Sequence, residues 1–207
     1  MNSKELNQQI RSSLTILIES ADELRDLDQA LGDGDLGITV TAGSNAVNAE
    51  LEKLGDDATP TDIARTCAKA FANANPSTMA ALVAGALLNG SRTWEGKTEI
   101  GLGEATDFVA AAAASISQRG KTEVGDKTIL DGIAAAADAL RASTDSTEAT
   151  ASVVAAAGRA VEETTGLQSR RGRASWLQER SIGLPDPGAT AFQRLVEAWA
   201  RTSQTSH

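Results

Sequence analysis

The sequence predicts an all-α protein, and both its composition and its hydrophobic pattern support this class. Alanine is abundant and occurs in runs at 110–114 and 134–137, while aromatic residues make up only 3% of the chain. Small side chains of high helix propensity favour helices that pack closely together. Apolar residues recur every three or four positions, and we find no convincing strand. The 207 residues suffice for one substantial core and are few for two, so 1–207 is expected to be a single domain.

Three helices are expected in the first third of the chain. Apolar residues at three- and four-residue spacing from Leu6 to Leu24 predict a long amphipathic helix that ends near Gly32. A second helix is predicted from about Gly37 to Leu54. A Thr-Pro pair at 59–60, typical of an N-cap and a first-turn proline, starts a third helix that extends through Phe71.

Five further helices complete the prediction. Breaks at Asn-Pro-Ser and a proline after Asp186 separate apolar, helix-periodic segments. These helices are expected at about 78–88, at 102–117, from 128 onward, at 146–166 and from 186 onward. Because the connections are short or medium in length, the fold expected is an eight-helix antiparallel up-and-down barrel or bundle.

Charge and composition exclude several classes of function. The formal net charge of −9 disfavours nucleic acid and anionic membranes, which need clustered positive charge. His207 is the only histidine, which excludes histidine acid–base catalysis and multi-histidine metal sites. Cys67 cannot form an internal disulfide and is expected in the core. No apolar run is long enough to span a membrane and the N-terminus is polar, so a cytoplasmic location is expected.

Three aspartates at the end of the first helix and in the following glycine-rich turn form the strongest candidate metal site. They are Asp28, Asp33 and Asp35. Carboxylates held this close repel one another unless a cation neutralises them. Mg²⁺ prefers oxygen ligands and keeps water and phosphate oxygens in its remaining positions, so the three could hold two Mg²⁺ ions on a polyphosphate. From the spacing alone, an Asp-Gly turn on a solvated acidic surface is an equal alternative.

Polar motifs also follow the third, fifth and seventh predicted helices, so an antiparallel arrangement places all four motifs at one end. The segments 75–78 and 125–128 each precede a helix, where hydroxyls and free N–H groups either bind phosphate or simply cap the helix. Four arginines between 170 and 180 form the densest positive cluster of the chain. Among them Arg173 is the strongest candidate for phosphate binding, because its small neighbours permit close approach. A solvated basic loop is the alternative.

Taken in this order, the motifs resemble the nucleotide-binding L-subunit family of dihydroxyacetone kinases. The matching segments are Leu27-Asp28 with Gly-Asp-Gly-Asp at 32–35, Gly-Asp-Lys-Thr at 125–128 with Asp131, and the long segment 172–190. The resemblance spans nearly the whole chain, and its last segment is highly specific. It implies an eight-helix antiparallel barrel with a nucleotide at one rim, in agreement with the helix count.

The resemblance also implies a role for each motif. Asp28, Asp33 and Asp35 would coordinate two Mg²⁺ ions that grip the phosphates of ADP or ATP. Arg173 would be the catalytic residue and would also contact the nucleotide. The other implied nucleotide-binding residues are Gly37, Ile38, Thr39, Ser77, Thr78, Thr128, Asp186, Pro187 and Gly188.

The implied reaction is transfer of a phosphoryl group to a ketose hydroxyl. In the family a separate K-subunit holds the ketose through its own histidine, which would explain why this chain has no catalytic histidine. Dihydroxyacetone is the first expected substrate and a tetrulose such as erythrulose the second. The donor is either free ATP or a bound ADP that a phosphotransferase-system phosphocarrier recharges. A homodimer is expected.

Three positions depart from the family pattern. Leu36 stands where the family usually has His, which is expected to remove a donor near the phosphates. The segment 75–80 replaces a Gly/Ser-rich phosphate loop, and Trp176 replaces a tyrosine. The competing hypothesis is a non-catalytic barrel that binds a lipid-like ligand or a regulatory protein partner. The many alanines argue against it, since they predict a narrow interior.

Overall fold

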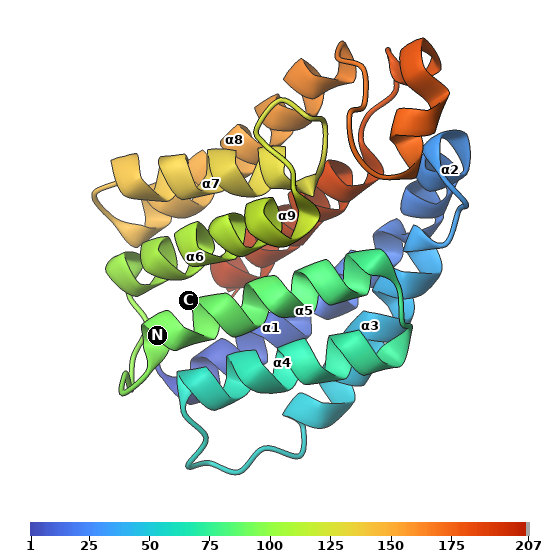
Figure 1. Ribbon diagram of the computed structural model, residues 1–207. Helices are drawn as coiled ribbons and strands as arrows, with labels where there is room; N and C mark the ends of the chain where they lie inside the picture. The colour runs from blue at the N-terminus through green and yellow to red at the C-terminus, as the bar shows by residue number, and fades with distance from the viewer. Residues whose placement is uncertain (206–207) are drawn as a thin grey trace.

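The computed structural model describes residues 1–205 and confirms the all-α class (Figure 1). The described residues form nine α-helices, three short 3₁₀ helices and no strand, apart from one isolated bridge between Asn2 and Glu99. The α-helices are α1 Ser3–Leu17, α2 Ala21–Leu31, α3 Leu36–Leu51, α4 Pro60–Ala74, α5 Thr78–Ser91, α6 Leu102–Gly120, α7 Ile129–Ala142, α8 Ser146–Thr165 and α9 Pro187–Thr205. The 3₁₀ helices are η1 Ile18–Ser20, η2 Arg92–Trp94 and η3 Arg173–Ser181. The only histidine, His207, lies outside the described residues.

The first predicted helix is two helices. The 3₁₀ turn η1 separates α1 from α2, and such a turn changes the direction of a helix without removing its hydrogen bonds. The apolar spacing continues across the break, since Leu17 and Leu24 are both buried in one cluster, and the pattern therefore gave no sign of it. Both helices contact α3 and α9, and α2 also contacts η3.

The helices close into a ring in chain order. Each helix from α3 to α9 packs on the next, and α9 packs on α1, where the Gln9 amide donates to the Trp199 carbonyl over 2.9 Å. Close packing depends on glycines that face aromatic rings across the helix contacts. Each of the three phenylalanines lies against a glycine of another helix, in the pairs Phe71 with Gly43, Phe108 with Gly90 and Phe192 with Gly132.

An apolar cluster lies where α1, α2 and α3 meet α5 and α9. Its members are Leu17, Leu24, Leu36 and Val40, with Met79, Ala191 and Leu195 packed against them. Leu36 is only 5% exposed. The expectation that Leu36 removes a donor near the phosphates stays a prediction. The side chain of Leu36 packs in this cluster, where the helices meet.

The four polar connections lie at one end of the ring, as the antiparallel arrangement predicts. In Figure 1 the α2–α3 turn, the α4–α5 loop and the η3 segment all lie on the right-hand side. Contacts between the connections agree: Asn75 donates to Thr39 on α3, Arg171 pairs with Asp126, and Arg173 pairs with Asp33. Among the described residues, no helix is both long and apolar enough to cross a membrane.

Candidate active site

Three carboxylates meet in the turn between α2 and α3. One oxygen from each of Asp28, Asp33 and Asp35 lies within 4.8 Å of the others. Asp28 comes from the last turn of α2 and Asp35 immediately precedes α3. Gly34 connects them in a left-handed conformation (φ +76°), which side chains with a Cβ rarely adopt. The sequence therefore folds locally into a loop that holds the three acids together.

The surroundings of the carboxylates show both attraction and repulsion. Asp28 accepts a hydrogen bond from the backbone N–H of Leu36 (3.2 Å), which fixes its orientation toward the start of α3. Desolvation, and next to it the negative charge of Asp28, raises the pKa of the Asp35 carboxyl above its ordinary value. The guanidinium of Arg173, from η3, forms an ion pair with Asp33. A cation is therefore already drawn to the cluster from a distant part of the chain.

Four helices point their N-termini toward this end of the ring. The starts of α5, α7 and α9 meet closely: a Cβ placed on Gly188 would lie 3.0 Å from Cε of Met79 and 3.2 Å from Cβ of Ile129. The start of α3 adjoins them, because Asn75, directly before α5, donates to the hydroxyl of Thr39 over 2.8 Å. Helix N-termini carry partial positive charge and free N–H groups. This end of the ring, formed by the starts of α3, α5, α7 and α9 and called the rim below, therefore suits an anion.

The predicted residues of α3 and α5 divide into exposed and internal groups. On α3, Gly37 packs against α2, Ile38 is 63% exposed, and Thr39 is buried beside Asn75. On α5, the hydroxyl of Ser77 caps the helix by accepting from the N–H of Ala80 (3.1 Å), and Thr78 is exposed. Ser77 therefore caps α5, its role toward a phosphate stays a prediction, and Ile38 and Thr78 are the exposed residues of this group.

The predicted residues of α7 and α9 also serve as helix starts. Thr128 caps α7 and shares a reciprocal capping box with Asp131. Asp186 accepts from the N–H of Ala189 (2.7 Å) at the start of α9, followed by the buried Pro187 and Gly188. Burial raises the pKa of Asp186 to about 7, against the lowering effect of that hydrogen bond.

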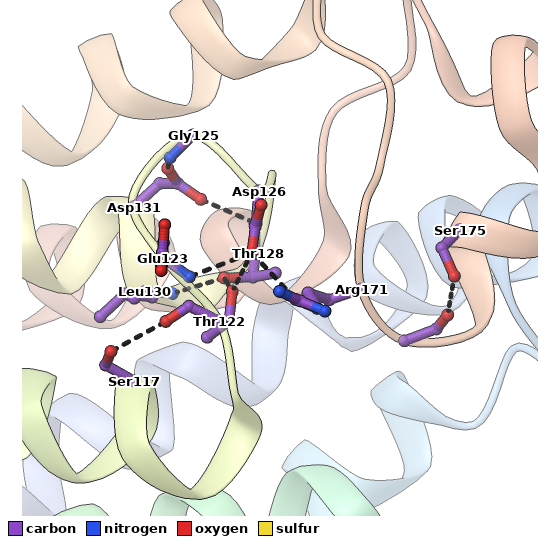
Figure 2. A network of polar contacts seen from close by, with 11 residues as sticks. Ser117, Thr122, Glu123, Gly125, Asp126, Thr128, Leu130, Asp131, Arg171 and Ser175 are labelled. Atoms are coloured by element: carbon purple, nitrogen blue, oxygen red, sulfur yellow. Dashed lines mark hydrogen bonds and ion pairs between the residues drawn. The ribbon is translucent and has the colours of Figure 1, made fainter.

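Sequence reasoning missed the residues that support this rim. Figure 2 shows the 122–131 turn, where Asp126 accepts from the N–H of Glu123 and from the side chain of Arg171. Lys127, in the same turn, is buried, although lysine is normally an exposed residue. The sequence predicts the 125–128 segment as a helix cap or a phosphate-binding segment, and no local feature indicates that its lysine is buried.

The donor set fits a hard divalent cation. All three ligand groups are carboxylates, which Mg²⁺ prefers, and Asp33 and its partner Arg173 are about half exposed, so added oxygen ligands can reach the cluster. No histidine or cysteine lies in the cluster to favour zinc.

Comparison with known proteins identifies the family. A sequence model described as the DAK2 domain matches residues 30–201. The chain is 34% identical, over 89% of its length and 88% of the relative, to the ADP-binding subunit DhaL of PEP-dependent dihydroxyacetone kinase 1 from Listeria innocua. It is 27% identical to the corresponding subunit from Escherichia coli, over 89% of this chain and 90% of that one.

Two longer proteins match over part of their length. L-erythrulose 1-kinase from Mycolicibacterium smegmatis is 32% identical over 85% of this chain, which covers 31% of that protein. The crystal structure of the dihydroxyacetone kinase from C. freundii in complex with AMP-PNP and Mg²⁺ superimposes with a TM-score of 0.74 at 18% identity. It covers 98% of this chain and 35% of that one, and it shows that the fold is shared. The extent of the domain match and of the Listeria alignment establishes that this chain belongs to the DAK2 domain family.

Proposed function

We propose that this chain is the Mg-ADP- or Mg-ATP-binding subunit of a ketose kinase of the dihydroxyacetone type. The observation that carries the proposal is the convergence, at one rim, of three carboxylates, four helix N-termini and Arg173. Such a rim has groups for a divalent cation and for phosphate oxygens side by side. The names of the relatives, which are kinases or kinase subunits, support the same class of reaction.

Each group has a distinct role in the proposed transfer. Asp28, Asp33 and Asp35 would hold two Mg²⁺ ions, whose charge would neutralise the phosphates. Arg173 would leave Asp33 and donate to phosphate oxygens, since a guanidinium forms strong charge-assisted bonds with them. The N-termini of α3 and α5 would stabilise the same negative charge with backbone N–H groups. Catalysis on this chain is therefore positioning and charge neutralisation.

The acceptor would come from another polypeptide. A K-subunit would present the hydroxyl of dihydroxyacetone, or of a tetrulose such as erythrulose, to the rim. The donor would be free ATP, or bound ADP recharged by a phosphocarrier; retention of ADP through purification and its rephosphorylation by the phosphocarrier would favour the second. The homodimer predicted above stays a prediction, which sedimentation analysis can test.

Calorimetric titration of nucleotide-free protein with ADP, with and without Mg²⁺, tests the proposal. We expect Mg²⁺-dependent binding that Asp33→Asn abolishes, because loss of a proposed ligand should cost more than the about 10–100-fold typical of residues behind the ligands. Asp56→Asn is the matched control, because it removes the same charge from an exposed residue in the α3–α4 connection. Equal affinity of wild type and Asp33→Asn, or binding that needs no Mg²⁺, would overturn the metal assignment.

A further inference from the structure

A buried lysine lies behind the proposed nucleotide rim. Lys127 is 1% exposed, and its ammonium donates to three backbone carbonyls: Thr165 at 3.1 Å, Leu167 at 2.9 Å and Ser181 at 2.7 Å. An ammonium has three donors, so all of its hydrogen-bonding capacity is used. Desolvation lowers the pKa of Lys127, while the negative charge of Asp186 opposes this effect. The residue adopts a left-handed backbone conformation (φ +64°), and its side chain lies inside the protein.

The three carbonyls lie at the two ends of one segment, residues 166–183. Thr165 ends α8 directly before the segment, Leu167 is its second residue, and Ser181 ends η3. One ammonium therefore joins the beginning and the end of the segment. Two further hydrogen bonds connect the same ends: the Ser169 N–H donates to the Ser181 hydroxyl (2.9 Å), and the Gly183 N–H donates to the Thr165 carbonyl (2.9 Å).

A second tie connects the segment to the 122–128 turn. The carboxylate of Asp126 accepts from Nε of Arg171 at 2.9 Å (Figure 2). The carbonyl of Asp126 accepts from the N–H of Arg170 at 3.0 Å. The Asp126 carboxylate is 8% exposed, which makes this pair less screened than a surface ion pair. Neighbouring residues of one turn, Asp126 and Lys127, thus hold the same segment.

The middle of the segment is exposed and reaches the aspartates. Arg173 pairs with Asp33, and Trp176 is 80% exposed. An exposed loop of this kind has few buried contacts of its own, so its position depends on how its two ends are held. Because the ends of the 166–183 segment are held in place and its middle is exposed, Arg173 can reach Asp33 although the two residues are far apart in the sequence.

We propose that Lys127 is a positioning residue that, together with the Asp126–Arg171 pair, holds the 166–183 segment so that Arg173 reaches the aspartate cluster. The effect on nucleotide affinity rests on the proposed function. The attachment of the 166–183 segment does not rest on the proposed function, so segment attachment and nucleotide affinity are measured separately.

Hydrogen exchange of the ligand-free protein tests the tethering. In Lys127→Met we expect the amides of 166–183 to exchange at least about tenfold faster, because three charge-assisted bonds are lost, while peptides from α3–α5 keep the wild-type rate. Lys121→Met is the matched control, since Lys121 is exposed in the same connection. Unchanged exchange in 166–183, or an equal increase in every peptide, would contradict the proposal.

A milder variant decides the question if Lys127→Met does not fold. Arg171→Ala removes a half-exposed side chain and should accelerate exchange of 166–183 about threefold. Arg170→Ala removes the same charge from the neighbouring exposed residue and should leave the rate unchanged. Equal rates in the two variants would show that the Asp126–Arg171 pair does not hold the segment.

A double-mutant cycle with Arg173→Gln tests positioning by ADP titration in the presence of Mg²⁺. We expect Lys127→Met to weaken binding about tenfold in the wild-type background and hardly at all when Arg173 is already glutamine. If Lys127 acted on the nucleotide through Asp186 instead, or only through global stability, the two losses would add and positioning would be refuted. If the wild type does not bind Mg-ADP, the proposed function fails, and the exchange measurement alone decides the tethering.

Discussion

Gly34 and Leu36 illustrate how single residues shape the rim. Gly34 takes the left-handed turn that brings Asp28 and Asp33 near Asp35, so its identity follows from backbone geometry. Leu36, one helical position after Asp35, turns inward to the cluster below. Residues next to one another in sequence thus divide between ligand groups on the surface and apolar support beneath them.

Cys67 offers a residue-scale prediction. Burial raises the pKa of its thiol to about 12, against an ordinary value of 9.0. The folded state holds the thiol proton more tightly than the unfolded chain does. The protonated thiol therefore adds fully to the free energy of unfolding below the pKa of the unfolded chain, and this addition declines as pH rises above that pKa. At about pH 8 we therefore expect no reaction of the native thiol with Ellman's reagent, and complete reaction in guanidinium chloride. A native rate equal to the denatured rate would show that Cys67 is accessible.

At the scale of helices, contacts between neighbours fix which element carries which part of the site. The N-terminus of α3 lies directly against α2: a Cβ on Gly37 would overlap the carbonyl oxygen of Ala21 and come within 3.0 Å of Cβ of Arg25. This close approach holds the start of α3 against the first turns of α2, and Asp28 lies further along α2, in its last turn. The helix pair therefore determines the geometry of the aspartate cluster.

Gly37→Ala should consequently separate the two helices. We expect a loss of about 1–3 kcal/mol in the free energy of unfolding, because the added methyl meets backbone that cannot rotate away. Gly103→Ala is the control: its Cβ would meet nothing within 4 Å, and alanine should stabilise α6 by about 0.5–1 kcal/mol. Chemical denaturation of both variants measures the difference, and equal stabilities would argue against tight α2–α3 packing.

At the scale of the whole molecule, ring closure joins the ends of the described chain. Arg194 on α9 forms two hydrogen bonds with the carboxylate of Glu23 on α2, at 2.7 and 2.8 Å. That hydrogen-bonded guanidinium lowers the pKa of Glu23. The rim combines residues from α2, α3, α5, α7, η3 and α9, so it exists only when the ring is closed.

Closure of the ring predicts one cooperative unfolding transition for residues 1–207. Mg-ADP at about 100 times its Kd should shift this whole transition upward by about 5 °C or more, because a ligand specific for the folded state stabilises it by about 2.7 kcal/mol. Differential scanning calorimetry with and without Mg-ADP measures both effects. Two separate transitions would show that the chain is not a single domain.

The sequence by itself determined the helices and the chemistry of the rim. Apolar spacing and caps such as Thr59-Pro60 located the segments, since both are local features of a helix. Asp28 and the two aspartates of the Gly-Asp-Gly-Asp turn were recognisable as a candidate cluster because they lie within eight residues of one another, and the structure brings their carboxylates within 4.8 Å.

Only the tertiary structure decided which residues support the rim. The inward turn of Leu36, the burial of Lys127 and the pairing of Arg173 with Asp33 all depend on segments far apart in the chain. The break at η1 likewise serves the packing of α2 on α3 and η3. Hydrophobic periodicity shows which face of a helix is apolar, but not which segment packs against that face. In this protein the packing segment decides the role of each of these residues.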